Sequence, residues 1–242
     1  MKLSDISVYV VSVKTFTERH DHIRQLAQLH GFSFEFVFDY DAVELSDNDW
    51  LRIGQPMSPQ CASTVLKHLE CQKRLCQTDC SMALVLEDDV LLFRGFAESV
   101  SEIVAEAQKL RPGWLVFLGG ADNKLDHRFF DSKKLELIEH PISTAEAYLI
   151  DRVGAKKRLA HLERKKIDLP ADHQLRAIDE CLGIRQFWSS KPLATQGSIT
   201  GLFETSLDRS RAKHSLLFLA IKFHWNRWRR QTLPKFFRRI TG

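Results

Sequence analysis

The sequence lacks several motifs and segments that would assign it to common protein classes. Neither G-x-x-x-x-G-K-[ST] nor G-x-G-x-x-G, the glycine-rich motifs that hold the pyrophosphate of ATP or NAD, occurs in its 242 residues. The apolar run near the C-terminus is about seven residues long, whereas a membrane-spanning helix needs roughly 20. The chain also contains no internal repeat and no low-complexity stretch. These absences argue against a P-loop ATPase, a Rossmann dehydrogenase and an integral membrane protein.

Cysteine is scarce, and its pattern favours neither disulfides nor zinc. The chain has five cysteines, an odd number: Cys61, Cys71, Cys76, Cys80 and Cys181. The C-x4-C-x3-C spacing of three of them lacks the close C-x2-C pairs that are usual in zinc sites, so inert thiols are favoured. The apolar start at residues 6–13 is short and has no basic segment or cleavage site, so we expect no signal peptide. These features predict a reduced, cytosolic protein.

Acidic residues are missing from the C-terminal segment. From Arg209 onward there are ten Lys or Arg residues and no Asp or Glu, whereas the preceding residues carry 25 basic and 31 acidic side chains. The formal net charge of +4 therefore divides into an acidic body of −6 and a basic tail. With 44% hydrophobic residues, the body can bury a sizeable core. We expect a catalytic domain over residues 1–208 and a basic amphipathic tail over residues 209–242.

Three interpretations of the tail remain open. From Ser215 onward, Leu, Phe and Trp are interleaved with Arg and Lys, as in amphipathic helices that lie on anionic membranes. Alternatively, residues 216–223 pack on the catalytic domain and the remainder forms a basic end. Arg with Trp and Phe can also bind nucleic acid, but the acidic body and the lack of a nucleic-acid-binding module weigh against it. We expect peripheral attachment to the inner face of the cytoplasmic membrane and no nucleic-acid partner.

The hydrophobic pattern predicts an α/β fold. A strand rich in Val and Ile at residues 6–13 precedes a helix from Thr17, the expected cap, to His30, and Gly31 ends this helix. A second strand at residues 34–38 completes a β-α-β opening that is typical of a parallel sheet. Further helices are expected at residues 62–77, 97–110, 152–164 and after Pro170, and further strands at residues 82–86, 114–118, 135–138, 145–150 and near Trp188.

Three carboxylates follow directly after one of the buried strands. The apolar residues 83–86 lead into Glu87, Asp88 and Asp89, and ligands bind at this carboxyl edge of open α/β sheets. Such close carboxylates repel one another, and a hard divalent cation, Mg²⁺ or Mn²⁺, relieves the repulsion. The cation bridges to nucleotide phosphates and neutralises a departing diphosphate. The pattern predicts a metal-assisted nucleotide site; an acidic turn that faces solvent and caps the next helix is the alternative.

Seven segments between Val8 and Ser206 carry a family resemblance. They are, in order, VYVVSVKTFTERHDHI, CASTVLKHLECQKRL, ALVLEDDVLL, WLVFLGG, STAEAYLIDRVGAKKRL, DLPADHQL and PLATQGSITGLFETS. Together they resemble glycosyltransferase family 25, the lipooligosaccharide galactosyltransferase family that also includes collagen galactosyltransferases. The resemblance implies a GT-A-like fold with a single nucleotide-binding sheet and flanking helices. It also implies inverting transfer of a hexose, often galactose from UDP-galactose, to a lipid-linked saccharide of lipooligosaccharide or lipopolysaccharide.

The resemblance also implies roles for the three carboxylates. They correspond to the Asp-x-Asp-like motif of the family, in which Asp89 is the expected direct ligand of the Mn²⁺ or Mg²⁺ ion. Asp88 would act directly or through water, and Glu87 would reach the ribose.

Inverting transfer needs a base that takes the proton of the attacking acceptor hydroxyl. Asp172 is the candidate, because it lies in the segment DLPADHQL and a proline-led helix start can hold a carboxylate rigidly. A plain helix-capping role is the alternative. Lys14 and Arg19, after the first strand, are expected at the base or diphosphate of the nucleotide, with Ser12 and Gln196 as further polar contacts. Solvated basic side chains are the alternative for Lys14 and Arg19.

The sequence departs from the family pattern at one place. Family members often have Gly-Cys-Ala-x-Ser-His before the central helix, whereas Gln60 and Val65 stand in place of the Gly and the His. This leaves the donor sugar open more than the reaction class. Two other functions also remain: a non-catalytic adaptor that binds membrane or nucleic acid through the tail, and a metal-dependent nucleotidyltransferase that releases pyrophosphate.

Overall fold

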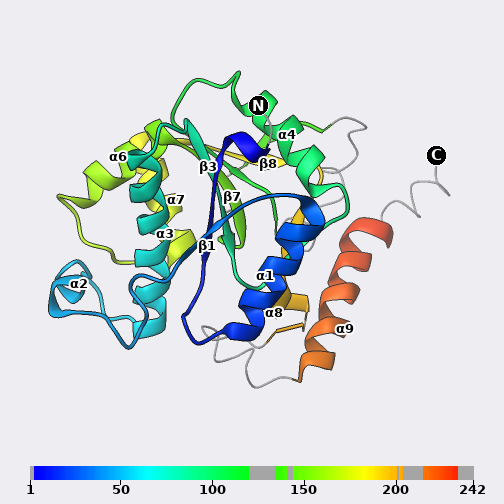
Figure 1. Ribbon diagram of the computed structural model, residues 1–242, viewed down its shortest axis with the longest axis horizontal. Helices are drawn as coiled ribbons and strands as arrows, with labels where there is room; N and C mark the ends of the chain where they lie inside the picture. The colour runs from blue at the N-terminus through cyan, green and yellow to red at the C-terminus, as the bar shows by residue number, and fades with distance from the viewer. Residues whose placement is uncertain (1–2, 120–134, 141–143, 201, 204–214, 234–242) are drawn as a thin grey trace.

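The computed structural model describes residues 3–119, 135–140, 144–200, 202–203 and 215–233. Within these residues, seven strands form one mixed sheet in the order β2-β1-β3-β7-β5-β8-β6 (Figure 1). The strands are β1 (Ser7–Val11), β2 (Glu35–Val37), β3 (Met82–Glu87), β5 (Trp114–Phe117), β6 (Leu137–Glu139), β7 (Ala147–Asp151) and β8 (Arg185–Ser189). The predicted α/β fold, with one main sheet and flanking helices, is confirmed.

The β-α-β opening forms as predicted, apart from its helix cap. Strand β1 pairs in parallel with β2 on one side and with β3 on the other, and α1 (Thr17–His30) connects β1 to β2. Gly31 ends α1 with a φ of 68°, a left-handed conformation that glycine adopts without strain. The predicted cap at Thr17 is wrong: the carbonyl of Phe16 accepts the first helical hydrogen bond, from the N–H of His20, so Thr17 is already inside the helix.

Strand β7 runs against its neighbours. It pairs antiparallel with both β3 and β5, and the edge strand β6 pairs antiparallel with β8. The sheet is therefore mixed, although its first three strands are parallel as the opening predicts. As a result, the N-terminal end of β7 meets the C-terminal end of β3, where the N–H of Glu87 donates to the carbonyl oxygen of Glu146.

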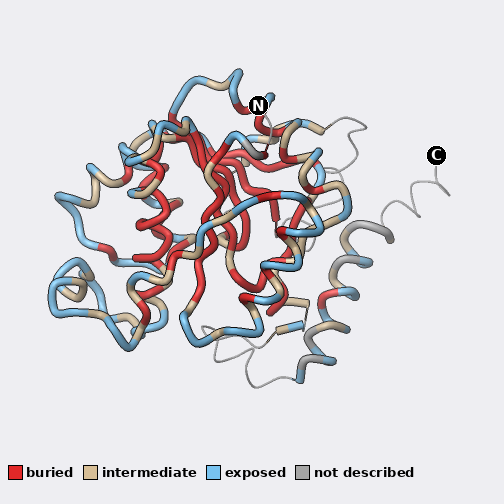
Figure 2. The backbone as a smooth tube through the Cα atoms, viewed as in Figure 1, coloured by how far each residue is buried: buried red, intermediate tan, exposed pale blue. Residues whose placement is uncertain are grey.

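Helices cover both faces of the sheet (Figure 1). On one face lie α1 and α4 (Phe96–Ala107); on the other lie α3 (Pro59–Gln77), α6 (Arg152–Leu162) and α7 (Ala171–Leu182). The alternation of β1 serves both layers, since Val8 and Val10 pack with the first group and Tyr9 and Val11 with the second. The central strands β1, β3, β5 and β7 are consequently almost entirely buried, whereas the edge strands β2 and β6 are partly exposed (Figure 2).

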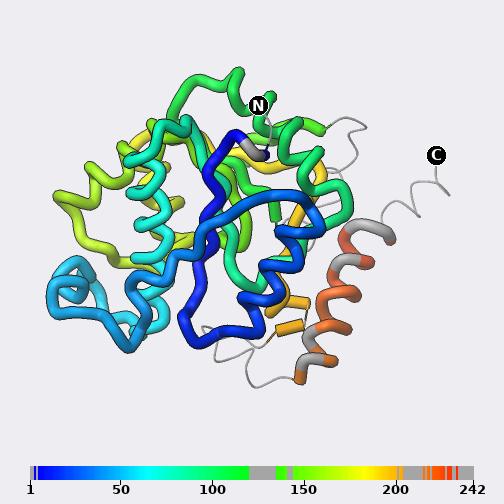
Figure 3. The backbone as a smooth tube through the Cα atoms, viewed as in Figure 1, coloured from blue at the N-terminus to red at the C-terminus, as the bar shows by residue number. Residues whose placement is uncertain are grey.

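Several elements were missed or start earlier than predicted. Helix α3 begins at Pro59, three residues before the predicted start, because Ser58 caps it and proline is suited to the first helical position. The missed elements are α2 (Asp47–Leu51), α8 (Gly197–Thr200) and a two-stranded antiparallel ribbon of β4 (Val90–Leu92) and β9 (Ala194–Gln196). The ribbon brings the chain after β9 back beside the acidic turn that follows β3 (Figure 3).

Part of the predicted tail is a helix. Helix α9 (Leu216–Arg227) continues into a π-helical turn at Trp228–Thr232, and α9 packs against α8. None of the described helices is long and apolar enough to cross a membrane. The predicted boundary between residues 208 and 209 lies outside the described residues.

Candidate active site

The carboxyl ends of β1 and β3 open into a cavity of about 390 Å³. Its walls come from segments 11–19, 41–43, 60–67, 87–89 and 196–198. Both the position, at the carboxyl edge of parallel strands, and the size are typical of small-molecule sites in α/β proteins. The cavity therefore collects the acidic turn and most of the polar residues that the sequence singles out.

Asp88 is held from both sides. Arg19 Nη1 donates to Asp88 Oδ1 at 2.8 Å, and Ser12 Oγ donates to Oδ2 at 2.7 Å. His20 Nε2 lies 3.1 Å from Ser12 Oγ and 3.0 Å from the carbonyl oxygen of Val13. A carbonyl oxygen can only accept, so Nε2 carries the proton and the Ser12 hydroxyl proton points to Asp88.

Glu87 is oriented by a chain of neutral donors. Gln196 Nε2 donates to Glu87 Oε2 at 3.1 Å, and His68 Nε2 lies 3.4 Å from Oε1. Tyr148 Oη lies 2.9 Å from His68 Nδ1. Burial lowers the pKa of His68 to about 4, so its imidazole is neutral near pH 7. With Tyr148 donating to Nδ1, the Nε2–H of His68 points to Glu87.

One carboxylate oxygen of Asp89 has no hydrogen-bond partner among the described residues. The N–H of Ser198 donates to Asp89 Oδ2 at 3.1 Å, whereas Oδ1 is buried and accepts no hydrogen bond from the described residues. Burial raises the pKa of Asp89, and the charge of Asp88 adds to the shift while Arg19 opposes it. Burial, followed by the charges of Asp89 and Asp88, likewise raises the pKa of Glu87. Glu87 and Asp89 thus ionise less readily than isolated carboxyl groups.

These carboxylates fit a divalent cation. Mg²⁺ is usually held by one or two carboxylates together with substrate phosphates and water, rather than by an all-protein cage. Asp89 offers the buried Oδ1, and Asp88 is the adjacent carboxylate. In the described part of the chain, no three His, Cys, Asp or Glu side chains already converge as a metal cluster. Most of the coordination sphere would therefore come from phosphates and water.

Asp172 lies in the first turn of α7. The N-cap of α7 is Pro170, so the proline-led helix start is confirmed, and Asp172 Oδ1 accepts the N–H of His173 at 2.9 Å. The carboxylate is half-buried and is not part of the cavity wall. Burial and then the charge of Asp172 raise the pKa of Cys61, and the same charge adds to the raised pKa of Glu87. Asp172 therefore lies within electrostatic reach of the acidic turn.

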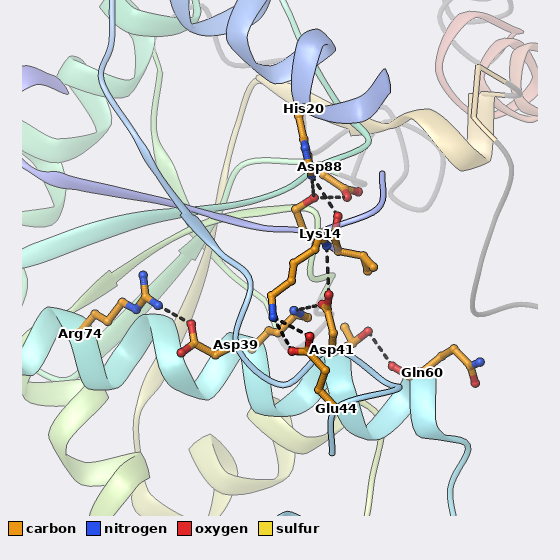
Figure 4. Close-up of polar contacts among 12 residues, drawn as sticks. Lys14, His20, Asp39, Asp41, Glu44, Gln60, Arg74 and Asp88 are labelled. Atoms are coloured by element: carbon orange, nitrogen blue, oxygen red, sulfur yellow. Dashed lines mark hydrogen bonds and ion pairs between the residues drawn. The ribbon is translucent and has the colours of Figure 1, made fainter. Parts of the chain in front are cut away.

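Lys14 differs from the other candidate residues in its position. Its Nζ makes an ion pair with Glu44 Oε2 at 2.5 Å, outside the cavity wall (Figure 4). Its backbone N–H donates to Asp41 Oδ2 at 3.0 Å. Ser12, Arg19 and Gln196, in contrast, all line the cavity.

A buried ion pair in the cavity wall was missed from the sequence. Lys67 Nζ donates to Asp41 Oδ1 at 2.6 Å, and both residues line the cavity. Burial lowers the pKa of Lys67, and Asp41 opposes that shift. Asp41 follows β2 at the edge where Ser12 follows β1, so the rule that ligands bind at the carboxyl edge could have indicated it. Lys67 gives no such signal.

Val65 stands where family members often have a histidine, and His68 supplies an imidazole nearby. Val65 is buried in an apolar cluster with Ile167 and Ala171. His68, one helical turn later on α3, presents its imidazole to Glu87. An imidazole is therefore present at the acidic turn even though Val65 cannot supply one.

Comparison with known proteins identifies a family. The model described as glycosyltransferase family 25 (LPS biosynthesis protein) matches residues 5–175. Among solved structures, the chain is similar to the galactosyltransferase LgtC in complex with donor and acceptor sugar analogs, at 10% sequence identity and a TM-score of 0.47. That similarity covers 90% of this chain and 96% of the other. The comparison with curated proteins finds no match.

Proposed function

The chain belongs to glycosyltransferase family 25, and we propose that it transfers a hexose, with inversion, from a nucleotide-sugar to the saccharide of a lipooligosaccharide or lipopolysaccharide. UDP-galactose is the proposed donor because the family resemblance favours it. One observation carries the proposal. The carboxylates of Glu87, Asp88 and Asp89 meet at the carboxyl edge of the sheet, and Asp89 Oδ1 lacks a partner among the described residues. A nucleotide diphosphate with its cation would satisfy that oxygen.

The proposed donor site assigns a different task to each residue of the cavity. Glu87, fixed by Gln196 and His68, suits hydrogen bonds from ribose hydroxyls, because its carboxyl oxygens can accept them. Arg19 lines the cavity beside Asp88, and its planar set of donors suits a diphosphate. A divalent cation held by Asp89 and Asp88 would neutralise the negative charge that develops on the leaving diphosphate.

Asp172 is the proposed general base. The acceptor hydroxyl oxygen bonds to the anomeric carbon while the bond from that carbon to the diphosphate breaks, and the diphosphate keeps the electron pair. The attack comes from the face opposite the diphosphate, so the configuration at the anomeric carbon inverts, and Asp172 takes the hydroxyl proton in the same step.

Nucleotide-sugar binding and hydrolysis test the proposal. Purified protein is incubated with UDP-, GDP- and CMP-sugars, with Mn²⁺, Mg²⁺ or a chelator, and compared with Asp89→Asn. We expect a UDP-hexose to bind and to be hydrolysed slowly only with metal, and Asp89→Asn to lose both. Asp47→Asn, at an exposed position of α2, is the matched control and should behave as wild type.

Two outcomes would overturn the proposal. Failure of every nucleotide-sugar to bind under all metal conditions would remove the donor site. Release of pyrophosphate instead of a nucleoside diphosphate would indicate the nucleotidyltransferase alternative.

A further inference from the structure

Helix α9 carries large apolar side chains on an exposed face. They are 42% to 72% exposed and form what we call the apolar stripe: Leu217, Phe218, Ile221, Trp225 and Trp228. At about 100° of rotation per helical residue, these positions fall within an arc of about 100°. The rings of Trp225 and Trp228 stack with centroids 5.3 Å apart, which agrees with a shared face.

The opposite face of α9 holds the helix against the body. Phe223 is buried, and helical rotation puts it roughly opposite the centre of the stripe. Helix α9 packs against α8 at the side of the molecule (Figures 1 and 2). Phe203, which follows α8, contacts His22 of α1 with ring centroids 5.0 Å apart. Helix α9 is therefore docked on the catalytic domain through its Phe223 face, and the apolar stripe on its other face points away from that domain.

Positive charge borders the stripe. Lys222 and Arg229 are exposed, and by helical rotation both lie next to the Phe218 side of the stripe. No acidic residue occurs from Arg209 to the C-terminus, so no anion of this segment offsets them. An apolar face with a basic border is complementary to a surface that is apolar inside and anionic outside.

We propose that the apolar stripe binds the surface of an anionic lipid bilayer, with α9 lying in the plane of the interface. Aliphatic and Trp side chains enter the boundary between headgroups and acyl chains, and Lys and Arg meet anionic headgroups. Self-association would bring two basic helices together, and like charges oppose that. The phosphates of a nucleic acid would bind the basic border, but they would not explain the exposed Leu217 and Ile221, because aliphatic side chains do not stack on bases. The proposal does not depend on the transfer reaction.

Vesicle flotation with the full-length chain tests the lipid-binding face without any sugar donor. We compare vesicles of phosphatidylcholine alone with vesicles that contain about one-third phosphatidylglycerol. The wild type should bind the anionic vesicles at least about tenfold more tightly than the phosphatidylcholine vesicles. Ile221→Gln/Trp225→Gln should weaken binding at least about tenfold. Lys222→Glu/Arg229→Glu should remove the preference for anionic vesicles. Leu51→Gln, 67% exposed on α2 at the other end of the molecule in Figure 1, is the matched control and should bind as wild type.

Several results would overturn the proposal. If the wild type does not bind vesicles, or if Ile221→Gln/Trp225→Gln binds them as tightly as the wild type does, the result contradicts a lipid-binding face. If light scattering shows that the same variant loses a dimer while its vesicle binding is unchanged, the stripe is a dimer interface instead. Binding of single-stranded DNA in fluorescence anisotropy, without vesicle binding, would assign the face to nucleic acid instead. If Ile221→Gln/Trp225→Gln does not fold, Leu217→Gln/Trp228→Gln tests the other half of the stripe with the same expected outcome.

Discussion

Replacing Lys67 by Met should destabilise the protein, because it leaves the carboxylate of Asp41 buried without its counter-ion. The two side chains are 2% and 4% exposed, and their charged atoms are 2.6 Å apart. Removing one partner of such a pair costs about 3–5 kcal/mol of unfolding free energy. The N–H of Lys14 still donates to Asp41, so we expect the lower end, about 3 kcal/mol. With a urea m-value of about 3 kcal/mol/M, the unfolding midpoint falls by about 1 M.

Urea unfolding followed by tryptophan fluorescence measures this shift in the midpoint. The double variant Asp41→Asn/Lys67→Met removes both charges and should recover more than half of the lost free energy. Lys109→Met removes a cation whose side chain is 67% exposed and should leave the midpoint unchanged. A midpoint for Lys67→Met within about 0.2 M of wild type would refute the reasoning, because the pair would then be well solvated.

Three further changes probe the acidic turn. Gln196→Ala removes the amide that donates to Glu87 and should lower kcat/KM for the donor about 10- to 100-fold in initial-rate assays. An unchanged kcat/KM would show that this hydrogen bond does not contribute to donor binding or transfer. Asp172→Asn cannot accept a proton and should lower kcat about 10²- to 10⁴-fold with little change in donor KM; an unchanged kcat would exclude it as the base. Burial lowers the pKa of His68 from 6.5 to about 4, so the stability that its neutral form contributes is complete above pH 6.5 and is lost as the pH falls towards 4. His68→Asn should therefore flatten the acid limb of stability in urea titrations, and an unchanged slope would contradict the burial argument.

The sequence predicts the main elements well because their apolar patterns are local. The strands around Val10 and Leu84 are continuous runs of apolar residues, and the predicted bounds of most helices agree with the structure within three residues. The reversed direction of β7 could not be predicted, because strand periodicity is the same in both directions. The ribbon of β4 and β9 was missed because strands of three residues are too short to show a period.

Some residues of the candidate site could also be predicted from the sequence, and others could not. Ser12, Arg19 and the acidic turn that begins at Glu87 could be predicted, because each follows a strand whose carboxyl end lies at one edge of the sheet. Lys67 and His68 could not, because a residue inside a helix acquires such a role only from its partners, and these lie 26 and 80 residues away in Asp41 and Tyr148. For Lys14, the sequence does not indicate the direction of the side chain: its backbone N–H contacts Asp41 in the cavity wall, whereas its ammonium group pairs with Glu44.

The ribbon of β4 and β9 also sets the order in which the enzyme can be completed on the ribosome. Synthesis proceeds from the N-terminus, so the acidic turn emerges long before the partner strand of β4 and before Gln196 and Ser198, which donate to Glu87 and Asp89. A nascent chain that ends before Ala194 carries all three carboxylates and lacks two of the groups that orient them. Such a chain therefore lacks part of the proposed donor site, which is completed only late in translation.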